Sequence, residues 1–87
     1  MNQSKASTDL VLYSTEACHL CDLAKALVLP LAREHSYSIA AVDVSETNEL
    51  MERYGIRIPV LRRTSDGAEL NWPFDRTSLN QFLTGSP

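Results

Sequence analysis

The sequence predicts a small α/β domain in which helices flank a mixed four-stranded sheet, in the order β-α-β-α-β-β-α. Short apolar runs rich in β-forming residues alternate with stretches whose apolar residues recur at helical spacing. A Ser65-Asp66-Gly67 turn separates two of these runs and indicates a β-hairpin at the end of the sheet. A chain of 87 residues has room for one hydrophobic core, so we expect a single domain over residues 1–87.

The first half of the chain supplies a strand, a long helix and a second strand. Residues Asp9 to Thr15 form a run with few charges, as in a strand that is covered on both faces. From Leu20 to about His35 the apolar spacing predicts a helix, which Pro30 should kink or interrupt because proline lacks the N–H of a helical residue. Tyr37 to Val44 is the second predicted strand.

A short helix is expected directly after this second strand. Ser45 is placed to cap it, since a serine side chain accepts a hydrogen bond from the free backbone N–H groups of a first turn. Gly55 is placed to end it, so the predicted helix spans residues 46–54.

The last third of the chain is predicted to form a hairpin followed by a helix. Residues 56–63 mix apolar and basic side chains and lead through the turn to a return strand over residues 68–72. Asp75 is the expected N-cap of the last helix, with Phe74 before it placed to pack against the first turn. This helix is expected to end near Gly85.

The composition argues against nucleic acid or a membrane as a partner. Apolar residues make up 44% of the chain, charged residues make up 22%, and the formal net charge is −3. Phosphate binding needs a clustered basic face. The densest basic group, Arg57, Arg62 and Arg63, is expected along one strand, where the last two point to opposite faces. The first nine residues lack the apolar stretch of a signal peptide, so we expect a cytoplasmic protein, and a monomer.

The two cysteines form the sequence Cys18-His19-Leu20-Cys21 where the first strand meets the first helix. In a reducing compartment this spacing indicates redox or metal chemistry rather than a structural crosslink. The free N–H groups and the dipole of a helix N-terminus favour a thiolate, so Cys18 is the candidate nucleophile. Cys21 follows one helical turn later on the same side and is the candidate resolving cysteine.

Two other functions are consistent with the same residues. His19 and His35 could complete a zinc site, but His35 would lie roughly 20 Å from Cys18, at the far end of the helix. One chain cannot close that site, whereas two chains could share a metal ion or an iron–sulfur cluster. The third possibility is a redox-inactive module that binds an extended peptide in the groove beside Pro59. Pro59 interrupts a strand-like run, which indicates an edge, a bulge or a cis peptide bond.

The order of these motifs resembles the glutaredoxin and thioredoxin superfamily, and most closely its short glutaredoxin-like branch. Leu12-Tyr13-Ser14-Thr15 precedes the cysteine pair, and Arg53-Tyr54-Gly55-Ile56-Arg57-Ile58-Pro59-Val60-Leu61 and the Asp66-Gly67 turn follow it. The resemblance runs from Leu10 to Leu83. It implies a thioredoxin-like fold and a thiol–disulfide oxidoreductase that acts on protein or glutathione disulfides through Cys18 and Cys21. It also implies that Pro59 is cis and lies beside Cys18, and that the Ile58 backbone pairs with the extended substrate.

Three features of typical glutaredoxins are replaced in this chain. These are the proline and tyrosine between the cysteines, a lysine shortly before them and a glycine pair before the last helix. Here the corresponding residues are His19-Leu20, Glu16 and Trp72-Pro73-Phe74, of which Trp72 and Phe74 are expected in the core or at its rim. Arg57 and Asp75 fall where the family meets the charged ends of glutathione. We therefore expect weak glutathione binding, with glutathione as a possible co-substrate, and neither a resident cofactor nor a metal.

Overall fold

The structure, a computed structural model, describes residues 8–84 and contains the predicted elements in the predicted order. The elements are β1 (Leu10–Ser14), α1 (His19–Glu34), β2 (Ile39–Asp43), a short 3-10 turn η2 (Val44–Glu46), α2 (Asn48–Tyr54), β3 (Val60–Arg63), β4 (Glu69–Asn71) and α3 (Arg76–Thr84). The predicted α/β architecture is confirmed. None of these helices is long and apolar enough to cross a membrane.

The four strands form one sheet in the order β2-β1-β3-β4. β1 runs parallel to β2, with Leu10 opposite Ile39, and antiparallel to β3, with Leu10 opposite Arg63. The β3–β4 hairpin adds the antiparallel edge that the Asp66-Gly67 turn predicted. β1 is therefore an inner strand with a partner on each side.

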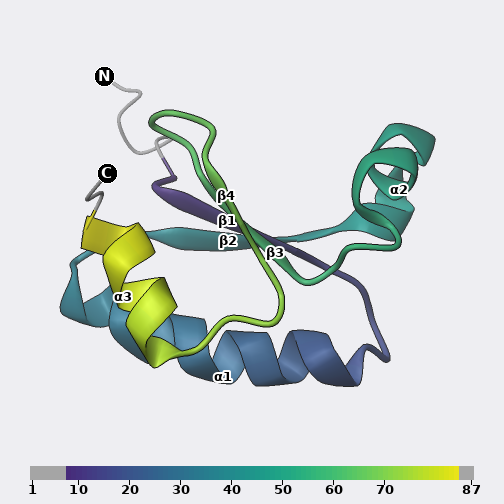
Figure 1. Ribbon diagram of the computed structural model, residues 1–87. Coiled ribbons are helices and arrows are strands. Elements are labelled where there is room, and N and C mark those ends of the chain that lie inside the picture. The colour runs from purple at the N-terminus through teal and green to yellow at the C-terminus, as the bar shows by residue number, and fades with distance from the viewer. Residues whose placement is uncertain (1–7, 85–87) are drawn as a thin grey trace.

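The helices cover the two faces of the sheet unequally. Figure 1 shows α1 and α3 on one face and α2 apart from them, at one end of the sheet. The main core lies between the sheet and the helices α1 and α3. Its buried members are Leu10, Leu12, Ala24, Val28, Leu31, Ala32, Leu61, Phe74, Leu79 and Leu83. A smaller cluster of Val44, Tyr54 and Val60 joins α2 to the other face.

Helix α1 is continuous through Pro30, so the prediction that the helix restarts there is wrong. Pro30 is exposed, on the opposite side of the helix from the buried residues Ala24, Val28 and Leu31. The carbonyl that would have accepted an N–H from residue 30 therefore faces water, which supplies a hydrogen bond at little cost.

Helix α2 begins two residues later than predicted, and Thr47 rather than Ser45 caps it. The Thr47 side chain accepts the Leu50 N–H at 3.1 Å. Ser45 instead lies inside η2, which Asp43 caps, and its N–H and hydroxyl both donate to the Asp43 carboxylate, at 2.9 and 2.7 Å. Gly55 ends the helix as predicted.

The third strand begins at Val60 rather than at residue 56. The N–H groups of Arg57 and Ile58 donate to the Tyr54 carbonyl, so the segment after α2 is a turn and not a strand. Arg57 is therefore not on one strand with Arg62 and Arg63, contrary to the prediction. The Ile58–Pro59 peptide is cis, as the resemblance implied, and Trp72–Pro73 is also cis, which the sequence did not indicate.

The final hairpin and helix follow their sequence signals closely. Arg63 forms an ion pair with Asp66 at 2.6 Å across the turn, and this hydrogen bond lowers the pKa of Asp66 to about 2. Asp75 caps α3 by accepting the Ser78 N–H at 2.8 Å. Phe74 is buried and Trp72 packs on the core beside it, as predicted. The predicted helix end at Gly85 lies outside the described residues.

We expect Leu61→Ala to lower the free energy of unfolding by about 2–5 kcal/mol, because it leaves a cavity in the main core. Leu61 is fully buried, whereas Leu23 on α1 is 44% exposed. Leu23→Ala is therefore the matched control, with an expected loss below about 1 kcal/mol. Urea unfolding followed by circular dichroism measures both, and equal losses would contradict this assignment of the core.

Candidate functional site

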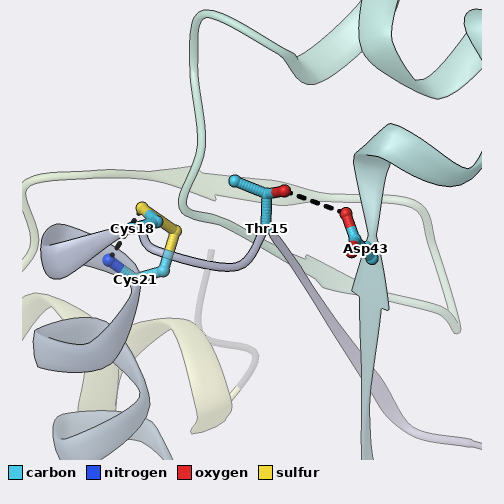
Figure 2. Close-up of a disulfide and its surroundings, with 4 residues drawn as sticks. All are labelled: Thr15, Cys18, Cys21 and Asp43. Atoms are coloured by element: carbon cyan, nitrogen blue, oxygen red, sulfur yellow. Dashed lines mark hydrogen bonds between the residues drawn. A yellow bond between two sulfur atoms is a disulfide. The ribbon is translucent and has the colours of Figure 1, made fainter.

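Cys18 and Cys21 lie at the N-terminus of α1 and are joined by a disulfide (Figure 2), with 5.2 Å between their Cα atoms. Cys18 is the N-cap of the helix and has extended backbone angles. Its Sγ accepts the Cys21 N–H at 3.2 Å. The predicted placement of Cys18 at a helix N-terminus is confirmed, and a thiolate at this position gains a backbone hydrogen bond and the positive end of the helix dipole.

The two sulfur-bearing residues differ in access to solvent. Cys18 is half-buried, whereas Cys21 is only 3% exposed and lies on the buried side of α1. An incoming disulfide or thiol therefore reaches Cys18 first. This difference agrees with the predicted roles of nucleophile for Cys18 and resolving cysteine for Cys21.

The Ile58–Pro59 segment lies at the same end of the sheet as the disulfide. Val60 is opposite Tyr13 in the β1–β3 register, so Pro59 follows at the level of Ser14, where β1 ends and the loop to Cys18 begins. Pro59 is fully buried, and Ile58 packs against the smaller cluster. The structure thus brings together two motifs that are about 40 residues apart in the sequence.

The two charged candidates for substrate binding are both engaged within the fold. Arg57 donates to Glu69 at 3.4 Å and to Asn71 at 3.3 Å. The Asp75 carboxylate serves as the cap of α3, and the Ser78 N–H that it accepts lowers its pKa. Their role toward a ligand stays a prediction, as does that of Ile58 and Pro59.

A Thr15–Asp43 hydrogen bond near the disulfide was not found by sequence reasoning. Thr15 Oγ1 donates to Asp43 Oδ1 at 3.0 Å, from the loop before Cys18 to the end of β2. The pKa of Asp43 is lowered, first by the Ser45 N–H and then by the hydroxyls of Ser45 and Thr15. One signal was available: Asp43 ends a strand predicted to be parallel to the first, and the carboxyl ends of parallel strands meet at one edge.

Tyr54 is a second residue that sequence reasoning missed. It is 2% exposed, its ring stacks on Tyr13 at 4.0 Å, and its hydroxyl donates to Glu69 at 2.7 Å. Burial, together with this hydrogen bond, raises the pKa of Tyr54 to about 12. Since its carbonyl also accepts two N–H groups of the following turn, Tyr54 anchors the segment that leads to Pro59.

His35 does not come together with the cysteines. His35 lies at the C-terminus of α1, half-buried, where its Nε2 is 2.9 Å from Asn80 Oδ1 and its ring stacks on Tyr37. Within residues 8–84, no group of three or more His, Cys, Asp or Glu side chains is arranged to hold a metal ion.

The sheet has the strand order β2-β1-β3-β4, and the helix after its inner strand β1 carries a Cys-x-x-Cys disulfide at its N-terminus. This combination defines a thioredoxin-like protein with a redox-type centre. The chain belongs to the glutaredoxin-like domain family (DUF836), whose model matches residues 9–84. The resemblance inferred from the sequence is confirmed. No curated protein is similar enough in sequence to count as a match.

Solved structures of similar proteins have the same fold. The X-ray structure of protein XcR50 from X. campestris is 40% identical, with a TM-score of 0.77, and the match covers 90% of this chain and 99% of that one. Protein Ne2328 from Nitrosomonas europaea is 25% identical, with a TM-score of 0.70 over 99% of this chain and 96% of that one. A glutathione S-transferase from Pichia kudriavzevii, 16% identical, has a TM-score of 0.58 and is matched over 92% of this chain and 37% of its own, which shows the fold alone.

We expect limiting iodoacetamide at mildly acidic pH to label Cys18 before Cys21 in the reduced protein. Cys18 is the more exposed thiol, and the Cys21 N–H stabilises its thiolate. Mass spectrometry of the peptides measures the order of labelling. The urea-unfolded protein is the control, in which the two thiols should react at similar rates, and preferential labelling of folded Cys21 would reverse the assigned roles.

Proposed function

We propose that the protein is a thiol–disulfide oxidoreductase that reduces disulfides with its Cys18–Cys21 dithiol. One observation carries this proposal: an accessible Cys18 sulfur is bonded to a buried Cys21 sulfur. The Cys21 N–H holds the Cys18 sulfur at the N-cap of α1. Membership of the glutaredoxin-like domain family supports the same class of chemistry.

The first step is nucleophilic attack by the Cys18 thiolate on one sulfur of a substrate disulfide. A bond forms between Cys18 Sγ and that sulfur, the substrate S–S bond breaks, and the second substrate sulfur leaves as a thiolate that takes a proton from water. The N-terminus of α1 increases the fraction of Cys18 that is ionised and ready to attack.

The second step releases the substrate. Cys21, deprotonated, attacks Cys18 Sγ, the Cys18–Cys21 disulfide forms, and the remaining substrate sulfur leaves as a thiolate. The substrate has gained two electrons and the protein has lost two. A thiol reductant then returns the protein to the dithiol, and two glutathione molecules, which become one glutathione disulfide, supply the electrons needed.

We propose a protein disulfide rather than a glutathione mixed disulfide as the better substrate. Arg57 is tied to Glu69 and Asn71, and the Asp75 carboxylate is used as a helix cap, so neither charge is free for the charged ends of glutathione without losing these bonds. The Ile58 N–H already donates to the Tyr54 carbonyl, so we propose that the Ile58 carbonyl is the backbone group that pairs with an extended chain, and such pairing needs no charged ligand.

Cys18→Ser should abolish the reduction of insulin, whereas Cys21→Ser should stop the reaction at the mixed disulfide. The first change removes the nucleophile and the second removes only the thiol that releases the substrate. Insulin turbidity measures turnover, and non-reducing electrophoresis detects the trapped covalent complex. Full turnover by Cys18→Ser, or no trapped complex with Cys21→Ser, would contradict these roles.

Arg57→Ala should change the reduction of a glutathione mixed disulfide by less than about threefold, the effect of a partly screened surface charge. A conventional glutaredoxin assayed in parallel provides the reference rate, which we expect to exceed that of this protein. The matched control is Arg53→Ala, because Arg53 is an exposed arginine of the neighbouring α2. Turnover equal to the reference, together with a sharp loss only in Arg57→Ala, would show that glutathione is a good substrate bound by Arg57.

A further inference from the structure

The loop of residues 15–17 presents Cys18 to solvent and has few restraints of its own. Ala17 has a φ of 58°, in the left-handed region that is disfavoured for residues other than glycine. Glu16 and Ala17 form a local turn, and within residues 8–84 no loop backbone hydrogen bond joins residues 15–17 to another segment of the fold. The position of this turn relative to the sheet therefore depends on side-chain contacts with the rest of the fold.

Thr15 makes such a contact. Its hydroxyl donates to Asp43 at 3.0 Å, across a sequence separation of 28 residues. Figure 2 shows Thr15 between the disulfide and Asp43, with its hydroxyl turned to the carboxylate. The β1–β2 register pairs Ser14 with Asp43, so the acceptor lies beside the residue from which the loop departs.

Asp43 is itself held in place, which makes it a fixed anchor. The N–H and the hydroxyl of Ser45 donate to the same Oδ1 atom that accepts from Thr15. These bonds favour the ionised carboxylate, and a hydroxyl–carboxylate hydrogen bond is stronger than one between neutral groups. None of these bonds involves a cysteine, so the position of the carboxylate that binds Thr15 does not depend on the redox state of the cysteines.

The disulfide cannot replace this restraint. It joins two residues that both belong to the cap and first turn of α1, so it closes a small ring within the helix and does not cross to the sheet. In the dithiol form that ring is absent as well. The tie from the loop to β2 is then the hydrogen bond of Thr15.

We propose that Thr15 is a positioning residue, which, through its hydrogen bond to Asp43, holds Cys18 at the N-cap of α1 and so maintains the acidity of its thiol. The inference rests on the proposed function, in which Cys18 is the nucleophile. The contact at stake is the 3.2 Å bond from the Cys21 N–H to Cys18 Sγ, because hydrogen bonds weaken steeply as distance and angle depart from ideal.

Thr15→Val tests this with the least change in shape, since it replaces a hydroxyl by a methyl group. The Cys18 N-cap should loosen and its thiolate should lose stabilisation, so the midpoint of the pH profile of Cys18 alkylation should move upward. At a pH below that midpoint the alkylation rate should fall by about three- to tenfold, the factor that corresponds to one hydrogen bond. Peptide mass spectrometry of the reduced full-length protein gives the rate at Cys18 alone.

Two further variants separate positioning from loss of stability. Thr15→Ser keeps a hydroxyl and should restore the wild-type pH profile. Ser45→Ala removes only the hydroxyl donor to Asp43, and the carboxylate is still held by the Ser45 N–H and still accepts from Thr15, so the Cys18 midpoint should be unchanged even where urea unfolding shows a lower stability. A Thr15→Val midpoint equal to wild type, an equal shift in Ser45→Ala, or no restoration by Thr15→Ser would each overturn the proposal.

Failure of this inference and failure of the proposed function give different results. Where the wild-type protein does not reduce insulin, the proposed function fails, yet the alkylation profiles still decide whether Thr15 positions Cys18. Where the wild-type protein reduces insulin and Thr15→Val alkylates and turns over as the wild type does, the function stands and the positioning role is wrong. A parallel three- to tenfold loss of insulin reduction in Thr15→Val alone supports both.

Discussion

The position of β1 between β2 and β3 determines where every part of the candidate site lies. Its parallel partner ends at Asp43 and its antiparallel partner begins at Val60, both at the end of the sheet where β1 gives way to the loop that carries Cys18. Three distant segments of the chain meet there as a result. A slip of one residue in either pairing would turn the side chains of that strand to the wrong face and separate these contacts.

The alternation of side chains along β1 also links the two sides of the molecule. Leu10 and Leu12 face α1 and α3 in the main core, whereas Tyr13 points the other way and stacks on Tyr54 of α2. Tyr54 in turn holds the start of the segment that contains Pro59 through its backbone carbonyl. One strand thus supports both the helix that presents Cys18 and the segment that we propose to receive the substrate.

The helix caps and the turn that the sequence predicted depend on neighbouring residues, whereas the side-chain bonds at the site that it did not predict join distant ones. The caps formed by Cys18 and Asp75 and the turn at Gly67 are local signals, and the structure contains all three. Ser45 had the right chemistry for a cap, but it lies inside η2, where it donates to Asp43. The Thr15–Asp43 and Tyr54–Glu69 bonds join residues 28 and 15 positions apart, and only the folded sheet makes them neighbours.

The charged side chains of Arg57, Glu69 and Asp43 are bound within the fold, and this affects what the site can select. Arg57, Glu69 and the Tyr54 hydroxyl form one connected group, and Asp43 is held by Thr15 and Ser45. Recognition by charge would first have to break these bonds, whose energy is of the same order as that of a new ion pair at the surface. Recognition through the Ile58 carbonyl and the accessible sulfur of Cys18 breaks none of these bonds. We infer that substrates are selected by an extended backbone next to a disulfide rather than by a charged end group.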